Sequence, residues 1–77
     1  MLVGRVSHNV VAPTKHPGLA GAKLLMISFD DGSPLLLATD AVGAGEGDRV
    51  VVATGSHAVG IVAPETPTDA VVVGILD

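Results

Sequence analysis

The chain has 77 residues, a formal net charge of −4 and no cysteine, which allows one small domain and excludes disulfide support. Its four fixed cations and single aromatic residue are too few for the phosphate contacts and base stacking that nucleic-acid binding requires, so no nucleic-acid partner is expected. Hydrophobic residues make up 48% of the chain, more apolar surface than a lone small barrel is expected to bury, and self-association is the natural consequence.

The N-terminal residues lack the charged and apolar regions of a signal peptide. No apolar run reaches the roughly 18 residues that a spanning helix needs. We therefore expect a soluble, cytoplasmic protein with no membrane partner.

Residues 2–11 alternate between apolar and polar positions, which predicts a half-buried first strand. Val6 and Val10 fall on its interior face, and His8 shares that face. A histidine at such a position is more often a packed or hydrogen-bonded core residue than a ligand.

Residues 12–21 contain two prolines and two glycines, which predicts a long loop. Leu19 is the large apolar residue within this loop. We expect it to pack as a plug against the barrel or against a neighbouring subunit.

Residues 23–29 form a nearly continuous apolar run, typical of a strand that is covered on both faces. Asp30, Asp31 and Gly32 then predict a tight turn before a third strand over residues 35–38. The adjacent carboxylates have two interpretations, a pair for acid–base work or cation binding and a pair of solvated turn formers; the second is more common at a hairpin tip.

Three glycines, Gly43, Gly45 and Gly47, lie within five residues. They superficially resemble a dinucleotide-binding loop, but that motif requires a helix after it, and here a β-branched segment follows. The pattern predicts a turn between strands, where glycine permits positive φ or a close approach of another backbone.

The remaining chain predicts a fourth strand over residues 49–54 and a final strand over residues 70–76. Between them, Ser56 is expected to cap a short helical turn through His57 and Val59, and residues 64–68 form a polar connector. The expected fold is all-β: one domain over residues 1–77, a five-stranded OB-like barrel with at most one short helical turn.

Catalytic chemistry has no evident place in this sequence. No serine lies in a nucleophile elbow, and His8, His16 and His57 show no metal-ligand spacing, so no catalytic, cofactor-binding or metal-binding residue is expected. A metal held by histidines from distant segments at a subunit interface is the open alternative. Lys15 could serve an anion-binding loop, although a loop lysine is more often solvated or ion-paired.

An ordered set of segments resembles the EutN/CcmL family of bacterial microcompartment vertex proteins over essentially the whole chain. The Asp-Ala-Val-Gly-Ala-Gly segment beginning at Asp40 is the most specific of them. The complete set comprises Lys15-His16-Pro17 with Leu19 and Gly21, Lys23-Leu24-Leu25, Asp40 to Gly45 with Gly47, Gly55-Ser56, Asp69-Ala70, and Val73 to Asp77.

This resemblance implies a non-enzymatic subunit that forms homopentamers at the five-fold vertices of a shell. Hexameric or trimeric shell proteins, and in some cases encapsulated enzymes, would be its partners, and no cofactor is implied. The residues implied in subunit contacts or in the turn are Lys15, Leu19, Lys23, Asp40, Val42, Gly43, Gly45, Gly47 and Asp69. One departure is that relatives usually carry a basic residue after Gly55-Ser56, whereas this chain continues with His57-Ala58-Val59-Gly60.

Two other classes remain as hypotheses. A small ligand-binding or protein-binding adaptor barrel would be monomeric and would carry an apolar groove. A metal-dependent enzyme would require the three imidazoles to converge.

Overall fold

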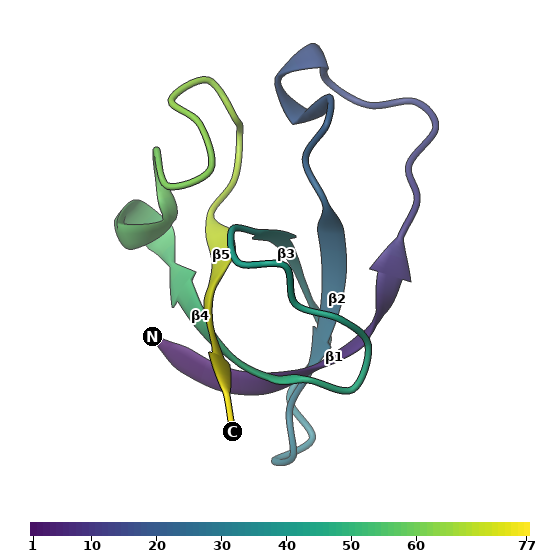
Figure 1. Ribbon diagram of the computed structural model, residues 1–77, viewed down its shortest axis with the longest axis vertical. Helices are drawn as coiled ribbons and strands as arrows, with labels where there is room; N and C mark the ends of the chain where they lie inside the picture. The colour runs from purple at the N-terminus through teal and green to yellow at the C-terminus, as the bar shows by residue number, and fades with distance from the viewer.

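A computed structural model describes residues 1–77 as a closed barrel of five strands with no α-helix (Figure 1). Around the barrel the order is β1-β2-β3-β5-β4, and β4 pairs with β1 to close it. Every neighbouring pair is antiparallel except β3 and β5, which are parallel. The strands are β1 (Leu2–Val10), β2 (Leu24–Ser28), β3 (Leu36–Asp40), β4 (Arg49–Thr54) and β5 (Ala70–Leu76). The predicted all-β, OB-like barrel is confirmed, and the predicted bounds of β4 and β5 agree with the structure.

The core is aliphatic and small. It contains nine buried residues, contributed by all five strands and by one residue of the segment between β3 and β4. Phe29, the only aromatic residue, and Leu36 pack against its edge. These nine, the central cluster among the 16 buried residues of the chain, are Val6, Leu25, Ile27, Ala38, Ala44, Val50, Val52, Ala70 and Val72.

A β-bulge in β1 changes which residues face the interior. Val6 pairs with Ile27, but the next pair joins His8 to Met26, so β1 carries one extra residue at this point. The alternation that predicted an interior His8 is broken there. His8 is exposed, and its Nδ1 lies 3.0 Å from the hydroxyl of Ser7. The prediction of a core histidine was therefore wrong.

Two 3-10 turns interrupt the connections. The first, η1 (Pro17–Leu19), lies in the segment that was predicted to be a plain loop. The second, η2 (Gly55–Ala58), begins two residues before His57, with Thr54 rather than Ser56 at its N-cap. Thr54 makes no side-chain hydrogen bond to the turn, so the predicted serine cap was wrong. Nowhere in this structure is there a helix with the length and apolar character needed to cross a membrane.

The barrel has two different ends. The long segments between β1 and β2 and between β4 and β5 project from one end, whereas the β2–β3 turn lies at the other (Figure 1). The two long segments touch: a methyl group at Gly18 would lie 2.7 Å from the backbone oxygen of Glu65 and 2.9 Å from Cδ of Pro67. Only a glycine allows this contact, which links the two loops at that end.

Candidate functional site

The segment of residues 41–48 between β3 and β4, here called the glycine turn, holds most of the residues singled out from the sequence. Its middle residue Ala44 is fully buried in the barrel core. Its end joins β1, because the Gly47 N–H donates to the Val6 oxygen at 2.9 Å and the Val6 N–H donates to the Asp48 oxygen at 2.9 Å. The turn is thus part of the barrel wall rather than a free loop.

Asp40, the last residue of β3, fixes the shape of this turn. One carboxylate oxygen accepts the Val42 N–H at 3.1 Å, and the other accepts the Ala44 N–H at 2.9 Å. The side chain of Asp40 is only 2% exposed. Buried backbone N–H groups need partners, and a carboxylate can accept several hydrogen bonds at once. Asp40 therefore substitutes for the strand partner that the backbone loses where β3 ends.

Lys23 supplies the matching positive charge. Its Nζ lies 3.7 Å from Asp40 Oδ2, the only ion pair in the structure, and it also donates a hydrogen bond to the backbone oxygen of Ala44. The Lys23 side chain remains 41% exposed, whereas the Asp40 side chain is buried, so the ion pair lies at the edge of the protein surface. Lys23 thereby ties the start of β2 to the middle of the glycine turn.

Asp48 closes the second half of the turn, and this residue was missed from the sequence. Its Oδ2 accepts the Gly45 N–H at 2.8 Å, while its own N–H donates to the Gly45 oxygen at 3.0 Å. An aspartate three residues after a glycine and directly before a strand is a usable signal, because short carboxylates commonly bond to nearby backbone in turns.

The three glycines of the turn have different requirements. Gly43 and Gly47 adopt φ of 81° and 90°, a region that other residues avoid, whereas Gly45 has an ordinary φ. No atom lies within 4 Å of a methyl group placed at Gly43 or Gly47. Within the chain, backbone conformation and not close approach explains these two glycines.

Close approach occurs instead at two glycines that sequence reasoning did not single out. One is Gly18, described above. The other is Gly4 in β1, where a methyl group would lie 2.5 Å from Cγ2 of Ile27 and 2.8 Å from the Ser28 oxygen. A glycine isolated within a strand pattern was the available signal for Gly4.

The remaining predicted residues lie outside the turn. Lys15 is exposed and donates to the Ala12 oxygen at 3.0 Å. Leu19 is half-buried at the end of η1, and Asp69 is exposed just before β5. The structure therefore brings Lys23, Asp40 and the glycine turn together, and leaves Lys15, Leu19 and Asp69 apart from them.

The surface is rich in exposed apolar side chains. Val42, at 42% exposure, places one beside the glycine turn, and Leu37 of β3 is 47% exposed. The full set of large hydrophobic residues that remain exposed comprises Met1, Leu2, Val3, Val11, Leu35, Leu37, Val42, Val59, Ile61, Ile75 and Leu76. A small single domain that exposes this much apolar surface has area available for contact with another protein chain.

No group of three or more histidine, aspartate or glutamate side chains is placed to hold a metal ion. His16 instead accepts the Gly18 N–H at its Nδ1, at 2.9 Å, as the N-cap of η1. The polar atoms of the molecule mainly support its turns, and no buried side-chain nitrogen or oxygen lacks a hydrogen-bond partner.

Comparison with known proteins places this small closed barrel in one family of shell proteins. Residues 1–77 match the family described as ethanolamine utilisation protein EutN/carboxysome. The carboxysome shell vertex protein CcmL of Gloeobacter violaceus is 41% identical over all of this chain and 83% of its own length.

Two solved structures agree over the full chain. The pentameric microcompartment shell protein GrpN from Rhodospirillum rubrum superposes with a TM-score of 0.86 at 38% identity, covering 100% of this chain and 94% of that one. CsoS4B from Halothiobacillus neapolitanus gives a TM-score of 0.91 at 33% identity, covering 100% and 99%. The chain belongs to the EutN/CcmL family of bacterial microcompartment shell vertex proteins.

Proposed function

We propose that this protein is a structural, non-catalytic shell subunit that assembles as a homopentamer at the vertices of a bacterial microcompartment. The observation that carries the proposal is the full-length match to a pentameric shell protein, with a TM-score of 0.86 and no unmatched domain in this chain. Exposed apolar residues such as Val42 give the physical reason for assembly, because they offer contact area that a neighbour can cover.

Cyclic symmetry suits such a subunit. A ring requires two different surfaces of one chain to be complementary, so that each copy meets the next through unlike faces. Five-fold rings inserted among six-fold tiles introduce the curvature that a flat layer lacks. We infer that hexameric or trimeric shell proteins surround the ring and that enzymes lie inside the closed shell.

The contacts that we propose between subunits use the glycine turn and its surroundings. Val42 and the face of the turn are exposed in one copy, while the side chains that shape the turn are satisfied within that copy. The turn can therefore meet a neighbour as a preformed surface. Lys15, Leu19 and Asp69 are proposed as further contact residues, since each is at least partly accessible.

Native mass spectrometry tests the ring directly. The purified protein should give a pentamer as the main species at micromolar concentration, and Val42→Asp should shift it to smaller species. Val11→Asp is the matched control, because Val11 is 86% exposed and lies outside the proposed contact set. A protein that remains monomeric would favour the adaptor hypothesis and contradict the proposal.

Shell closure requires a second experiment. Co-expression with a hexameric shell protein of the same compartment should give closed polyhedral particles by electron microscopy, whereas omission of this chain should give tubes, sheets or particles with open vertices. Identical closed particles in both cases would remove the vertex role even if the pentamer were present.

A further inference from the structure

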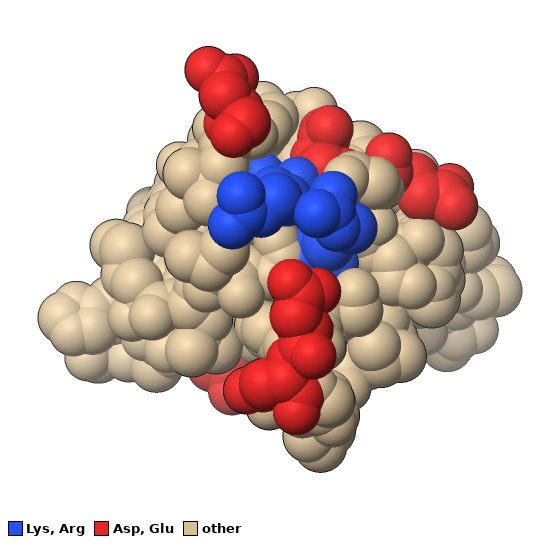
Figure 2. All heavy atoms as spheres, turned by 90° about the horizontal axis from the view of Figure 1, so that it is seen from below, with Lys and Arg blue, Asp and Glu red and all other residues tan.

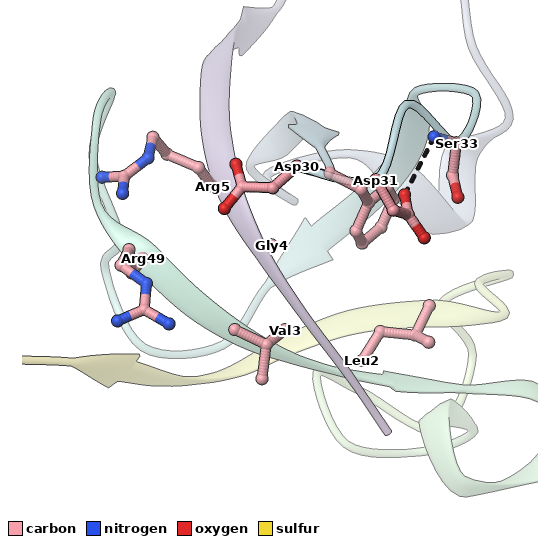
Figure 3. A pocket seen from close by; sticks show the side chains of 9 residues that line it. Leu2, Val3, Gly4, Arg5, Asp30, Asp31, Ser33 and Arg49 are labelled. Atoms are coloured by element: carbon pink, nitrogen blue, oxygen red, sulfur yellow. Dashed lines mark hydrogen bonds between the residues drawn. The ribbon is translucent and has the colours of Figure 1, made fainter.

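A hollow of about 350 Å³ lies at the barrel end that carries the β2–β3 turn, away from the Lys23–Asp40 pair. We call it the lower hollow; its walls are the start of β1, the β2–β3 turn and the first residue of β4. Figure 3 shows Arg5 and Arg49 on one side, Asp31 and Ser33 on the other, and Asp30 between them. On the face seen from below, the visible Lys and Arg side chains gather in one place, with carboxylates around them (Figure 2).

The two arginines are cross-strand neighbours, and neither makes an ion pair within the chain. Arg5 and Arg49 lie directly opposite in the antiparallel pairing of β1 with β4, an arrangement that is unfavourable for like charges. No carboxylate oxygen of the chain lies within 4.0 Å of either guanidinium. Arg5 is held in place by its hydrogen bond from Nη1 to the Gly47 oxygen at 2.8 Å. Arg5 is therefore held in place, and both guanidinium groups have free donors for an anionic group.

Negative charge lies on the opposite side of the hollow at Asp31 and between the two sides at Asp30 (Figure 3). The Asp30 carboxylate makes no hydrogen bond or ion pair within the chain, whereas Asp31 accepts the Ser33 N–H at 2.9 Å. Hydrogen bonding from the Ser33 hydroxyl, and then from its backbone N–H, lowers the pKa of Asp31, so this carboxylate is ionised at neutral pH. A ligand that is only anionic would be repelled on this side, and one that is only cationic would be repelled by the arginines.

The apolar part of the lining is contributed by Leu2, Val3 and Phe29, and Phe29 packs over Gly4. The volume lies at the small end of the range for small-molecule sites, about 300–1,000 Å³. We propose that the lower hollow binds a small zwitterion with an apolar body, an amino carboxylic acid in which the carboxylate contacts Arg5 and Arg49 and the ammonium contacts Asp30 and Asp31.

The probe for this proposal is 5-aminopentanoate, with pentanoate and pentylamine as analogues that each lack one charge. Titration of the isotopically labelled protein, in its assembled form, should shift the amide signals of residues 2–5, 29–33 and 49 in a saturable way. Because both charged sides contribute, the zwitterion should bind at least about tenfold more tightly than either analogue, the factor that corresponds to about 1.4 kcal/mol. Shorter and longer amino acids in the same series measure the spacing between the two sides.

Variants separate the two sides of the hollow. Arg49→Gln should weaken binding of 5-aminopentanoate by about tenfold or more, and Asp30→Asn should reduce its advantage over pentanoate. Glu65→Gln is the control, since it removes a charge from an exposed position outside both the hollow and the proposed contact set. This variant should retain full affinity.

The absence of saturable shifts with 5-aminopentanoate would overturn the proposal, as would equal affinity for pentanoate or an equal loss in Glu65→Gln. The mass of the assembly is measured on the same samples. A pentamer that fails to bind the probe refutes the hollow as a zwitterion site and leaves the vertex role intact, whereas a monomer that binds it does the reverse.

Discussion

The glycine turn and the lower hollow treat charge in opposite ways. In the turn, Asp40 and Asp48 accept hydrogen bonds from three backbone N–H groups, and Lys23 pairs with Asp40. These charged groups therefore have their partners within the chain and fix its shape. In the hollow, Arg5 and Arg49 face each other across two strands with no carboxylate within ion-pair distance. The difference indicates that charge in the turn supports the fold, whereas charge in the hollow is available to something outside the chain.

Removing the carboxylate of Asp40 should have the largest effect on stability. Asp40→Ala leaves two backbone N–H groups and Lys23 without their acceptor, and we expect a loss of about 3 kcal/mol in the free energy of unfolding. Chemical denaturation at one fixed protein concentration measures it, since assembly makes stability concentration-dependent. Asp40→Asn keeps one acceptor oxygen and should lose less. An Asp40→Ala protein within about 1 kcal/mol of the parent would show that the turn does not depend on this residue.

Gly4, which lines the lower hollow, should be the next most sensitive position for stability. Gly4→Ala forces a methyl group into Ile27 and the Ser28 backbone, and overpacking of this kind costs about 2 kcal/mol. Gly74→Ala in β5 is the matched control: a methyl group there would lie 3.7 Å from Val51, an ordinary contact. Thermal unfolding of both variants should separate them clearly, and equal stability would contradict the close packing described for Gly4.

Two glycines of the turn should differ from each other. Gly43→Ala places a side chain at φ of 81° and should cost about 1 kcal/mol, because the left-handed region is unfavourable for residues with a Cβ. Gly45→Ala should change stability by less than about 0.5 kcal/mol, since its φ is ordinary and its nearest contact is Asp48 at 3.8 Å. Denaturant midpoints decide this, and a larger loss at Gly45 would point to packing by a neighbouring subunit.

Loss of a charge in the hollow should barely affect stability. Arg49→Gln removes one member of a like-charge pair, so the free energy of unfolding should stay within about 0.5 kcal/mol or rise slightly. The comparison is Lys23→Gln, which loses the partner of Asp40 and should be the less stable of the two. If Arg49→Gln were the more damaging change, the contrast between the two regions would be wrong.

The smallest effect concerns the titration of Asp31. Its folded pKa lies below the ordinary value of 3.8, so its contribution to stability is present above that value and is lost as the pH falls through the folded pKa. Ser33→Ala should raise the pKa of Asp31 towards the ordinary value. Carboxyl chemical shifts followed between neutral and acid pH measure the change, and an unchanged pKa would exclude the Ser33 hydroxyl as its cause, because the backbone N–H is retained in this variant.

Sequence reasoning was most successful where one interaction dominates. The strands β4 and β5 were predicted with correct bounds because their β-branched runs are bordered by glycine, proline or polar residues. The resemblance to vertex proteins rested on an ordered set of segments, and the most specific of them begins with Asp40, whose side chain holds the glycine turn. The fold class and the family were therefore accessible from the sequence alone.

The failures came from contacts between distant segments. The bulge that exposes His8 depends on the pairing of β1 with β2, which no local pattern encodes. The need for glycine at Gly4 and Gly18 arises from residues far away in the chain, Ile27 and Glu65. The hollow likewise combines three separate segments, and its arginines looked like ordinary surface cations until they were seen as neighbours across two strands.

The parallel pairing of β3 with β5 has a consequence for how the barrel forms and opens. It is the shortest of the strand pairings, with Thr39 opposite Val71 and Asp40 opposite Val72, and its partners are far apart along the chain. Contacts that close such long loops form late in folding and open early in native fluctuations. Because Asp40 also holds the glycine turn, a transient separation of β3 from β5 would loosen the turn as well. A neighbouring subunit bound to the turn would therefore also slow the opening of the barrel.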